Sequence, residues 1–227
     1  MICKSLHPDD YTDLQQGIAV AHKAYGWCLG HRIPIAWPHD HRLWEYASAF
    51  QAIVTRSLPC SILDVGAGNS ILGPQLALDG CDVKEIDQSP GVYTDQRNKV
   101  MAKYLDNFTS LKQDFFDLPA TETFDCVCAI SVMEHMPEDR QKEAWTKLVN
   151  HLSPGGLLVT TIDYSDKAGN WANADGRETQ FGPTQLEEVF GWLRDLEMVF
   201  EIDPKFHGNH VFDYTFYRII ATKAAKP

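Results

Sequence analysis

The sequence predicts an α/β fold in which helices cover a mostly parallel β-sheet, and three observations lead to this prediction. From Ile62 onward, short apolar runs alternate with stretches that have helical spacing, which is typical of strands paired in parallel. The first apolar run passes directly into a loop of small residues, 66–68. Near the end of the chain, only the stretch PKFHGNH separates two strand-like runs. It is too short for a helix, so these runs are expected to form an antiparallel hairpin.

The other apolar runs are expected to be strands because each is short and bounded by polar or turn-forming residues. In chain order, the clearest are ILDV, DVKEID, FDCVCAI and GLLVTTID. The clearest helix is PEDRQKEAWTKLVNHL, in which Ala144, Leu148 and Leu152 recur at regular helical spacing. Pro137 suits the first position of this helix, and SPGG ends it. A later helix is expected to begin near Pro183.

The first part of the chain, residues 1–39, differs from the remainder, 40–227. It shows no clear periodicity and is rich in aromatic residues and histidine, whereas residues 40–54 are expected to form a helix capped by Asp40. Aromatic residues in this part of the chain and in the predicted helix after it include Trp27, Trp37, Trp44 and Tyr46. We interpret residues 1–39 as a cap or lid that excludes water and selects a substrate. The alternative is ordinary packing by anchoring aromatics, which is the better interpretation for Trp44.

Composition and charge restrict the class of protein. The chain has 227 residues, a hydrophobic fraction of 44% and a formal net charge of -11, which together indicate one globular domain with an acidic surface. No run of Lys or Arg supplies a basic face, so nucleic acid is not an expected partner unless the fold assembles a basic patch. The start lacks a signal-peptide pattern, and no apolar run is long enough for a membrane span. We therefore expect a cytoplasmic protein.

Cysteines and carboxylates do not suggest a metal site. The chain has six cysteines, and none form a Cys-x-x-Cys pair. Cys126 and Cys128 share one face of a predicted strand and are expected to be buried free thiols. Asp163 and Asp166 are expected to be solvated separately. No metal is therefore expected.

The loop Gly66-Ala67-Gly68 lets backbone amides come close to a ligand, because glycine has no Cβ to hold the ligand away. It lies where α/β folds bind nucleotide-like ligands, at the carboxyl end of a strand, although a plain tight turn would use the same residues. Ile71 occupies the third glycine position of the dinucleotide fingerprint, which argues against a pyrophosphate ligand. Asp87, at the end of the second strand, can accept hydrogen bonds from both hydroxyls of a ribose, or it can simply start a turn.

Five motifs follow one another in order: LDVGAG, EID, LKQDFFDLP, FDCVCAISVMEHMP and LSPGGLLVTTID. In this order the chain resembles the class I S-adenosylmethionine-dependent methyltransferases, closely over residues 62–163 and more loosely through the final hairpin. One departure is Ser70, which stands where the family has its third motif glycine. The resemblance implies a Rossmann-like α/β fold, with a sheet of seven strands whose last strand is antiparallel and with helices on both faces.

The resemblance also implies roles in binding S-adenosyl-L-methionine. Asp64 would order the glycine loop and lie near the amino group of the cofactor. Asp87 would bind the ribose, Asp114 would bind the adenine amino group with Phe115 beside the ring, and Ser131 would lie near the sulfonium. The implied cofactor-binding residues are Asp64, Gly66, Ala67, Gly68, Asp87, Gln88, Asp114, Phe115 and Ser131. From the residues alone, Asp114 could instead cap a helix or turn, and Phe115 could belong to the core.

Methyl transfer depends mainly on alignment of the acceptor, and a base is needed only if the acceptor must lose a proton. His135 follows the fourth predicted strand and is the first candidate base, with packing or hydrogen bonding to its loop as the alternative. His207 and His210 lie in the turn of the final hairpin and are further candidates, unless that turn is merely solvated. Asp163 and Tyr164, at the end of the fifth strand, come next.

The function expected from this resemblance is methyl transfer from S-adenosyl-L-methionine to an oxygen or nitrogen atom of a small molecule, by direct displacement. Two alternatives stay open: a catalytically inactive cofactor-binding subunit of an enzyme complex, and another transferase, such as an aminopropyl transferase, on the same fold. Ile71 disfavours a nicotinamide dehydrogenase. The acceptor would be selected by the variable segments 1–40, 164–182 and 203–212, from which neither its identity nor the oligomeric state follows.

Overall fold

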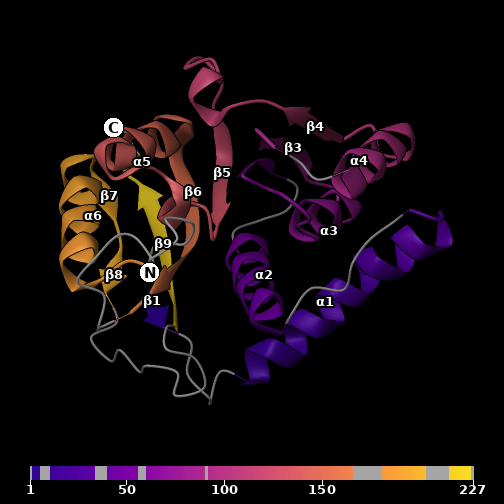
Figure 1. Ribbon diagram of the computed structural model, residues 1–227, viewed down its shortest axis with the longest axis horizontal. Coiled ribbons are helices and arrows are strands. Elements are labelled where there is room, and N and C mark those ends of the chain that lie inside the picture. Colours follow the sequence, from indigo (N-terminus) through magenta and orange to yellow (C-terminus); the bar gives the residue numbers. More distant parts are fainter. Residues whose placement is uncertain are drawn as a thin grey trace. The chain divides into compact units, whose positions relative to one another are not determined.

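The computed structural model describes residues 2–5, 11–33, 40–55, 60–89, 92–165, 180–202 and 215–225. The chain divides into two compact units (Figure 1). Unit 2 is Tyr11–Pro119, and unit 1 combines Met1–Asp10 with Ala120–Pro227. None of the helices within the described ranges is long and apolar enough to cross a membrane.

The sheet of unit 2 consists of three parallel strands, of which the first two were named in the sequence analysis. They are β2 (Ser61–Val65), β3 (Asp82–Asp87) and β4 (Phe108–Lys112). Strand β3 lies in the middle, with Ser61 of β2 opposite Asp82 and Phe108 of β4 opposite Val83. Because the strands run in the same direction, their carboxyl ends share one edge of the sheet. The glycine loop and Asp87 therefore lie at that edge, as expected.

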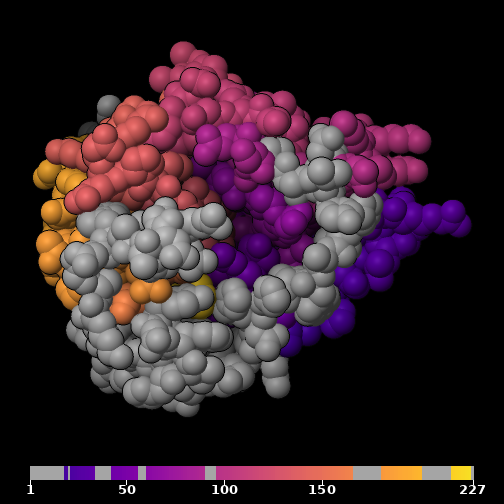
Figure 2. Space-filling view, viewed as in Figure 1, coloured from indigo at the N-terminus to yellow at the C-terminus, as the bar shows by residue number. Residues whose placement is uncertain are grey.

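The helices of unit 2 include one that the sequence did not predict. The four are α1 (Tyr11–Gly30), α2 (Asp40–Val54), α3 (Leu72–Leu78) and α4 (Val92–Tyr104). Helix α2 has its predicted bounds. Helix α1 was missed because the residues that it buries toward its carboxyl end, Ala21, Ala24 and Cys28, are small, so no stripe of large apolar residues marks its inner face. Its last turn protrudes from unit 2 (Figure 2), and Leu29 there is 55% exposed.

Packing between helices explains why Ile71 replaces a glycine. Ile71 is 1% exposed and immediately precedes α3. It forms a buried cluster with Ala21 of α1 and Leu43 of α2, and Tyr46 of α2 packs against this cluster. A glycine at this position would remove the side chain that joins the three helices. Trp44 is also buried, which confirms packing as the better interpretation of that residue.

Unit 1 has a mixed sheet. Its strands are β1 (Ile2–Ser5), β5 (Phe124–Ile130), β6 (Leu152–Tyr164), β7 (Met198–Val199), β8 (Glu201–Ile202) and β9 (Thr215–Lys223). Strands β5 and β6 are parallel, whereas β9 runs antiparallel to both β6 and β7. The predicted antiparallel hairpin and the antiparallel last strand are thus confirmed. Strand β1 pairs with β9 and β8, so the first residues of the chain join a sheet, which the sequence did not predict.

Two helices of unit 1 lie next to each other, α5 (Gln141–Asn150) and α6 (Pro183–Asp195) (Figure 1). Helix α6 begins at Pro183 as predicted, and α5 buries Ala144 and Leu148 as predicted. The expected ends of α5 were wrong. Pro137 precedes a separate 3-10 turn, Glu138–Arg140, and Leu152 begins β6, where it pairs with Phe124. Pairing with β5 therefore takes precedence over the helical spacing of Leu152.

Candidate active site

The glycine loop follows β2 and is held against the end of β3. The backbone N–H groups of Gly66 and Ala67 both donate to the carbonyl oxygen of Ile86, with N···O distances of 2.8 and 3.3 Å. Gly66 and Gly68 have φ values of 64° and 49°, a region that side chains with a Cβ rarely adopt. The turn therefore requires glycine at these positions, and it leaves the backbone uncovered by side chains there.

The carboxylate of Asp87 is oriented by backbone amides on both of its oxygens. Gly68 donates to Oδ2 over 2.9 Å, and Ser89 donates to Oδ1 over 2.7 Å. Asp87 is only partly buried, and each carboxylate oxygen can accept more than one hydrogen bond. The side chain is thus fixed in place while it retains capacity for an external donor, which is the arrangement that a ribose diol requires.

At the end of β4, Asp114 has the capping role that the sequence left as an alternative. Its Oδ1 accepts a hydrogen bond from the backbone N–H of Phe116 over 2.8 Å, at the start of the 3-10 turn Phe115–Asp117. Phe115 is 5% exposed and therefore packs inside the unit. The backbone N–H of Gln113 donates to the carbonyl of Asp87 over 3.0 Å, which ties the two strand ends together. Gln88 is exposed.

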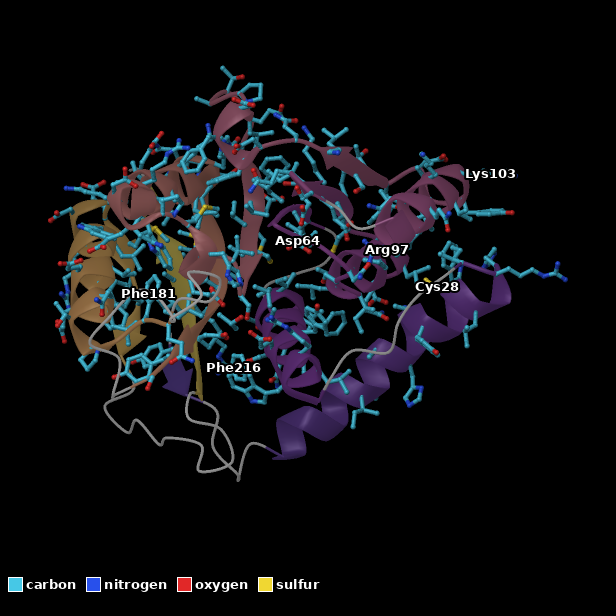
Figure 3. All side chains as sticks on the ribbon, viewed as in Figure 1. Cys28, Asp64, Arg97, Lys103, Phe181 and Phe216 are labelled. Carbon is cyan, nitrogen blue, oxygen red and sulfur yellow. The ribbon has the colours of Figure 1, made fainter. Side chains whose placement is uncertain are left out.

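Two buried carboxylates lie beneath the glycine loop. Asp64 of β2 is opposite Glu85 of β3, and both are at most 2% exposed. Arg97 of α4, which Figure 3 labels together with Asp64, donates to Oε2 of Glu85 over 2.9 Å. Burial raises the pKa of Glu85 to about 7, although the Arg97 guanidinium opposes the rise. Burial, followed by the charge of Glu85, raises the pKa of Asp64 well above its usual range.

One oxygen of each carboxylate is buried without a hydrogen-bond donor among the described residues: Oδ2 of Asp64 and Oε1 of Glu85. The Oε1 atom of Glu85 lies against Gly73, where an added Cβ would come within 2.3 Å of it. Gly73 thus accommodates Glu85 in the interior of unit 2. The buried Oδ2 of Asp64 is an acceptor that a bound ligand with an N–H group could satisfy.

Ser70 connects the loop to three helices. Its Oγ accepts a hydrogen bond from the backbone N–H of Leu72 over 3.0 Å, and its carbonyl accepts one from Arg97. The side chain of Ser70 also hydrogen-bonds Tyr46, whose pKa burial raises to about 12. Serine at the usual glycine position therefore supplies contacts that glycine cannot.

Sequence reasoning did not predict that Glu85 and Arg97 are buried, because charged residues are rarely buried unless they are paired. The alternation of the strand was the available signal for Glu85, since it places Glu85 on the same face as buried Val83. No comparable signal marks Arg97 on α4.

In unit 1, Ser131 directly follows β5 in a strained conformation. It has a φ of 49° and is 7% exposed. Its backbone N–H donates to both the carbonyl and Oγ1 of Thr161, over 3.0 and 3.1 Å. Glu134 is completely buried, and its Oε1 accepts a hydrogen bond from the N–H of Asp163 over 3.3 Å. A positive φ at a residue other than glycine is often retained at functional sites.

Three of the candidate bases lie within the described residues of unit 1. His135 is exposed and ends the 3-10 turn Met133–His135. His207 and His210 lie outside the described residues. Asp163 is partly buried, and Tyr164 is buried with its ring centroid 5.7 Å from that of Tyr217.

Comparison with known proteins identifies the domain. The structure is similar to a crystal structure of Burkholderia thailandensis 1,6-didemethyltoxoflavin-N1-methyltransferase with bound 1,6-didemethyltoxoflavin and S-adenosylhomocysteine. The TM-score is 0.63, at 17% identity over 96% of this chain and 91% of that one. Residues 62–156 match a family model described as a methyltransferase domain. This stretch is a class I methyltransferase domain. The predicted family and the predicted α/β Rossmann-like fold are therefore confirmed.

The chain is also similar in sequence to curated proteins. Hemagglutinin 1 of Eikenella corrodens is 28% identical over 131 residues, which cover 56% of this chain and 42% of that protein. A ubiquinone biosynthesis O-methyltransferase of Rickettsia typhi (strain ATCC VR-144 / Wilmington) is 27% identical over 139 residues, which cover 58% of this chain and 49% of that protein. The chain thus matches about half the length of these curated relatives. The family match includes the glycine loop, Asp87, Asp114 and His135.

Proposed function

We propose that this chain transfers a methyl group from S-adenosyl-L-methionine to an oxygen or nitrogen atom of a small molecule. The observation that carries the proposal is the Asp87 carboxylate, which the Gly68 amide orients at the end of β3. The relatives support both acceptor atoms, since one is named as an O-methyltransferase and another as an N-methyltransferase. The second of these was crystallised with S-adenosylhomocysteine.

The residues of unit 2 fit this cofactor. The Asp87 carboxylate suits two ribose hydroxyls, and charge-assisted hydrogen bonds of this kind are among the stronger ones. The buried Oδ2 of Asp64 suits a donor such as the amino group of the methionine part. Gly66 and Gly68 present backbone without a Cβ. We assign the adenine contact to Asp114 and Phe115, and further contacts to Ala67, Gln88 and Ser131.

When bound, the cofactor supplies an electrophilic methyl group on a positively charged sulfonium. The protein then has to hold the acceptor atom in line, and a base is needed only for an acceptor that loses a proton. We propose His135 as that base because it ends the short 3-10 turn that comes after β5 and its side chain is exposed. His207 and His210 are proposed to contact the acceptor.

The acceptor is proposed to be selected by residues 1–39, acting as a cap, and by segments 164–182 and 203–212. Part of this cap packs within unit 2. The ring of Trp27 stacks on His31 with a centroid distance of 4.2 Å, and it meets the edge of the Tyr104 ring at 6.3 Å. Trp37 lies outside the described residues. A small, uncharged or cationic acceptor suits the net charge of -11 better than a nucleic acid does.

The experiment that tests the function measures release of S-adenosylhomocysteine over a panel of small metabolites, followed by a crystal soaked with the best acceptor. The Asp87→Ala variant serves as the inactive reference. Calorimetry should show binding of S-adenosylmethionine or S-adenosylhomocysteine and no comparable binding of NAD. Tight binding of NAD without binding of the methyl donor would overturn the proposal.

A further inference from the structure

Two cysteines meet at the end of the unit 2 sheet that lies opposite the glycine loop. Cys60 immediately precedes β2, and Cys81 immediately precedes β3. Their Sγ atoms are 3.7 Å apart, and neither cysteine forms a disulfide. We propose that Cys60 and Cys81 form a modification site, at which a peroxide converts the two thiols into a reversible disulfide.

The backbone geometry suits this bond. Strands β2 and β3 pair in parallel from Ser61 opposite Asp82, so Cys60 and Cys81 occupy the preceding positions of adjacent strands. Neighbouring strands lie about 4.7–4.9 Å apart, which is within the Cα···Cα range of about 4.4–6.8 Å found in disulfides. The bond can therefore form without moving the strands apart.

Hydrogen bonds hold both backbones in this position. The N–H of Asp82 donates to the carbonyl of Cys60 over 3.0 Å. The N–H of Cys81 donates to the carbonyl of Leu76 over 3.0 Å, and the side chain of Asn107 donates to the carbonyl of Cys81 over 2.7 Å. The short distance between the sulfurs is thus a property of the folded strand ends.

The two thiols also differ in their exposure to solvent and in their surroundings. Cys60 is partly exposed, so a small oxidant can reach it, whereas Cys81 is buried. The hydrogen bond from Cys60 lowers the pKa of Cys81 to about 7, although burial opposes this. The pair therefore loses a proton near neutral pH. Either sulfur can donate the hydrogen bond that joins them, so the remaining proton can lie on Cys81, which leaves the thiolate, the reactive form, on the accessible Cys60.

The reaction with hydrogen peroxide balances in two steps. The Cys60 thiolate attacks one peroxide oxygen, the O–O bond breaks, and the leaving hydroxide takes a proton to become water, so that Cys60 becomes a sulfenic acid. The sulfur of Cys81 then attacks the Cys60 sulfur, the S–O bond breaks, and a second water leaves with the Cys81 proton. Two thiols have been oxidised, and one peroxide has been reduced to two waters.

A second thiol pair provides an internal comparison. Cys126 and Cys128 of β5 have Sγ atoms 3.8 Å apart, and both are buried. They lie two positions apart along one strand, where Cα atoms are roughly 6.5 Å apart at about 3.3 Å per residue, near the upper limit for a disulfide. This pair is therefore expected to stay reduced.

Trypsin separates the two pairs, because it cleaves after Lys and Arg. Cys60 and Cys81 fall together in peptide 57–84, and Cys126 and Cys128 fall in peptide 113–140. The folded protein is treated with hydrogen peroxide, and its remaining thiols are alkylated. The protein is then digested with trypsin, and the peptide masses are measured by mass spectrometry. Peptide 57–84 should become lighter by two hydrogen atoms and lose both alkylation sites, and dithiothreitol should reverse the change. Peptide 113–140 should stay alkylated.

Full alkylation of Cys60 and Cys81 after peroxide treatment would overturn the proposal, as would oxidation of both peptides to the same extent. In thiol titrations, Cys126→Ser should lose two thiols to peroxide as the parent does, and Cys60→Ser should form no disulfide in peptide 57–84. The disulfide closes a ring around β2, the glycine loop and α3, so it should raise the melting temperature. A lowered melting temperature would mean that the bond distorts the strand ends and would contradict the geometric argument.

Discussion

The backbone N–H of Gly68 donates to Oδ2 of Asp87 over 2.9 Å, and this bond joins the glycine loop after β2 to the end of β3. The loop and the carboxylate come from different motifs, yet each fixes the position of the other. Substitutions at the two residues should therefore both act on cofactor binding, and each can be compared with a similar residue elsewhere in unit 2.

Replacement of Asp87 by Ala is expected to weaken binding of S-adenosylhomocysteine by at least about tenfold. A hydrogen bond to a charged group contributes roughly 1.5–3 kcal/mol, and the variant loses the acceptor for both ribose hydroxyls. Isothermal titration calorimetry measures the effect. The matched control is Asp82→Ala, which removes an exposed carboxylate from the other end of β3. Equal affinities for the parent and Asp87→Ala would exclude Asp87 as the ribose contact.

Replacement of Gly68 by Ala should reduce cofactor affinity, because the new Cβ lies in the loop that we assign to the methionine part. The effect of backbone strain alone, without a cofactor contact, can be measured at Gly80. This residue has a φ of 92° and nothing within 4 Å of an added Cβ. Gly80→Ala should therefore lower the melting temperature without changing cofactor affinity. If the two variants bind the cofactor equally well, the loop does not contact it.

The buried Glu85 should make stability depend on pH. Its pKa is raised from 4.5 to about 7 in the folded chain, so the folded state holds the proton more tightly than the unfolded state does. The contribution of Glu85 to the free energy of unfolding is present below about pH 4.5 and is lost as the pH rises to about 7. The parent should therefore lose stability relative to Glu85→Gln across this window in urea unfolding. If the difference in the free energy of unfolding between the parent and Glu85→Gln stays constant across this pH window, Glu85 is ionised throughout it.

Replacement of His135 by Ala should lower kcat by about 10²–10⁴-fold if this residue is the general base. Cofactor affinity should stay unchanged, and the rate of the parent should rise with pH through a value near the usual histidine pKa of about 6.5. Lys142→Ala, which removes an exposed side chain from α5, serves as the control. His207→Ala and His210→Ala should mainly raise KM. Should kcat stay within a few-fold for all three candidate histidines, alignment alone carries the reaction.

Much of the candidate site could be predicted from the sequence because each of its parts lies within a short sequence motif. The glycine loop, Asp87 and Asp114 each follow an apolar strand directly, and parallel pairing places the carboxyl ends of β2, β3 and β4 at one edge. The residues that support the loop could not be predicted in this way. Arg97 reaches Glu85 and Ser70 from α4, and no local pattern in a helix records which distant carboxylate its side chain meets.

The sequence by itself determined the alternation of strands and helices from Ile62 onward, the hairpin at the end of the chain and the class of the domain. These follow from short-range patterns, since alternation, glycine positions and motif spacing act over a few residues. Only the tertiary structure decided that Ala21, Ala24 and Cys28 form a buried helix face, that Leu152 begins a strand, and that Cys60 lies beside Cys81. The physical reason is that burial and pairing depend on neighbours that are distant in sequence, and small or charged residues carry no local sign of them.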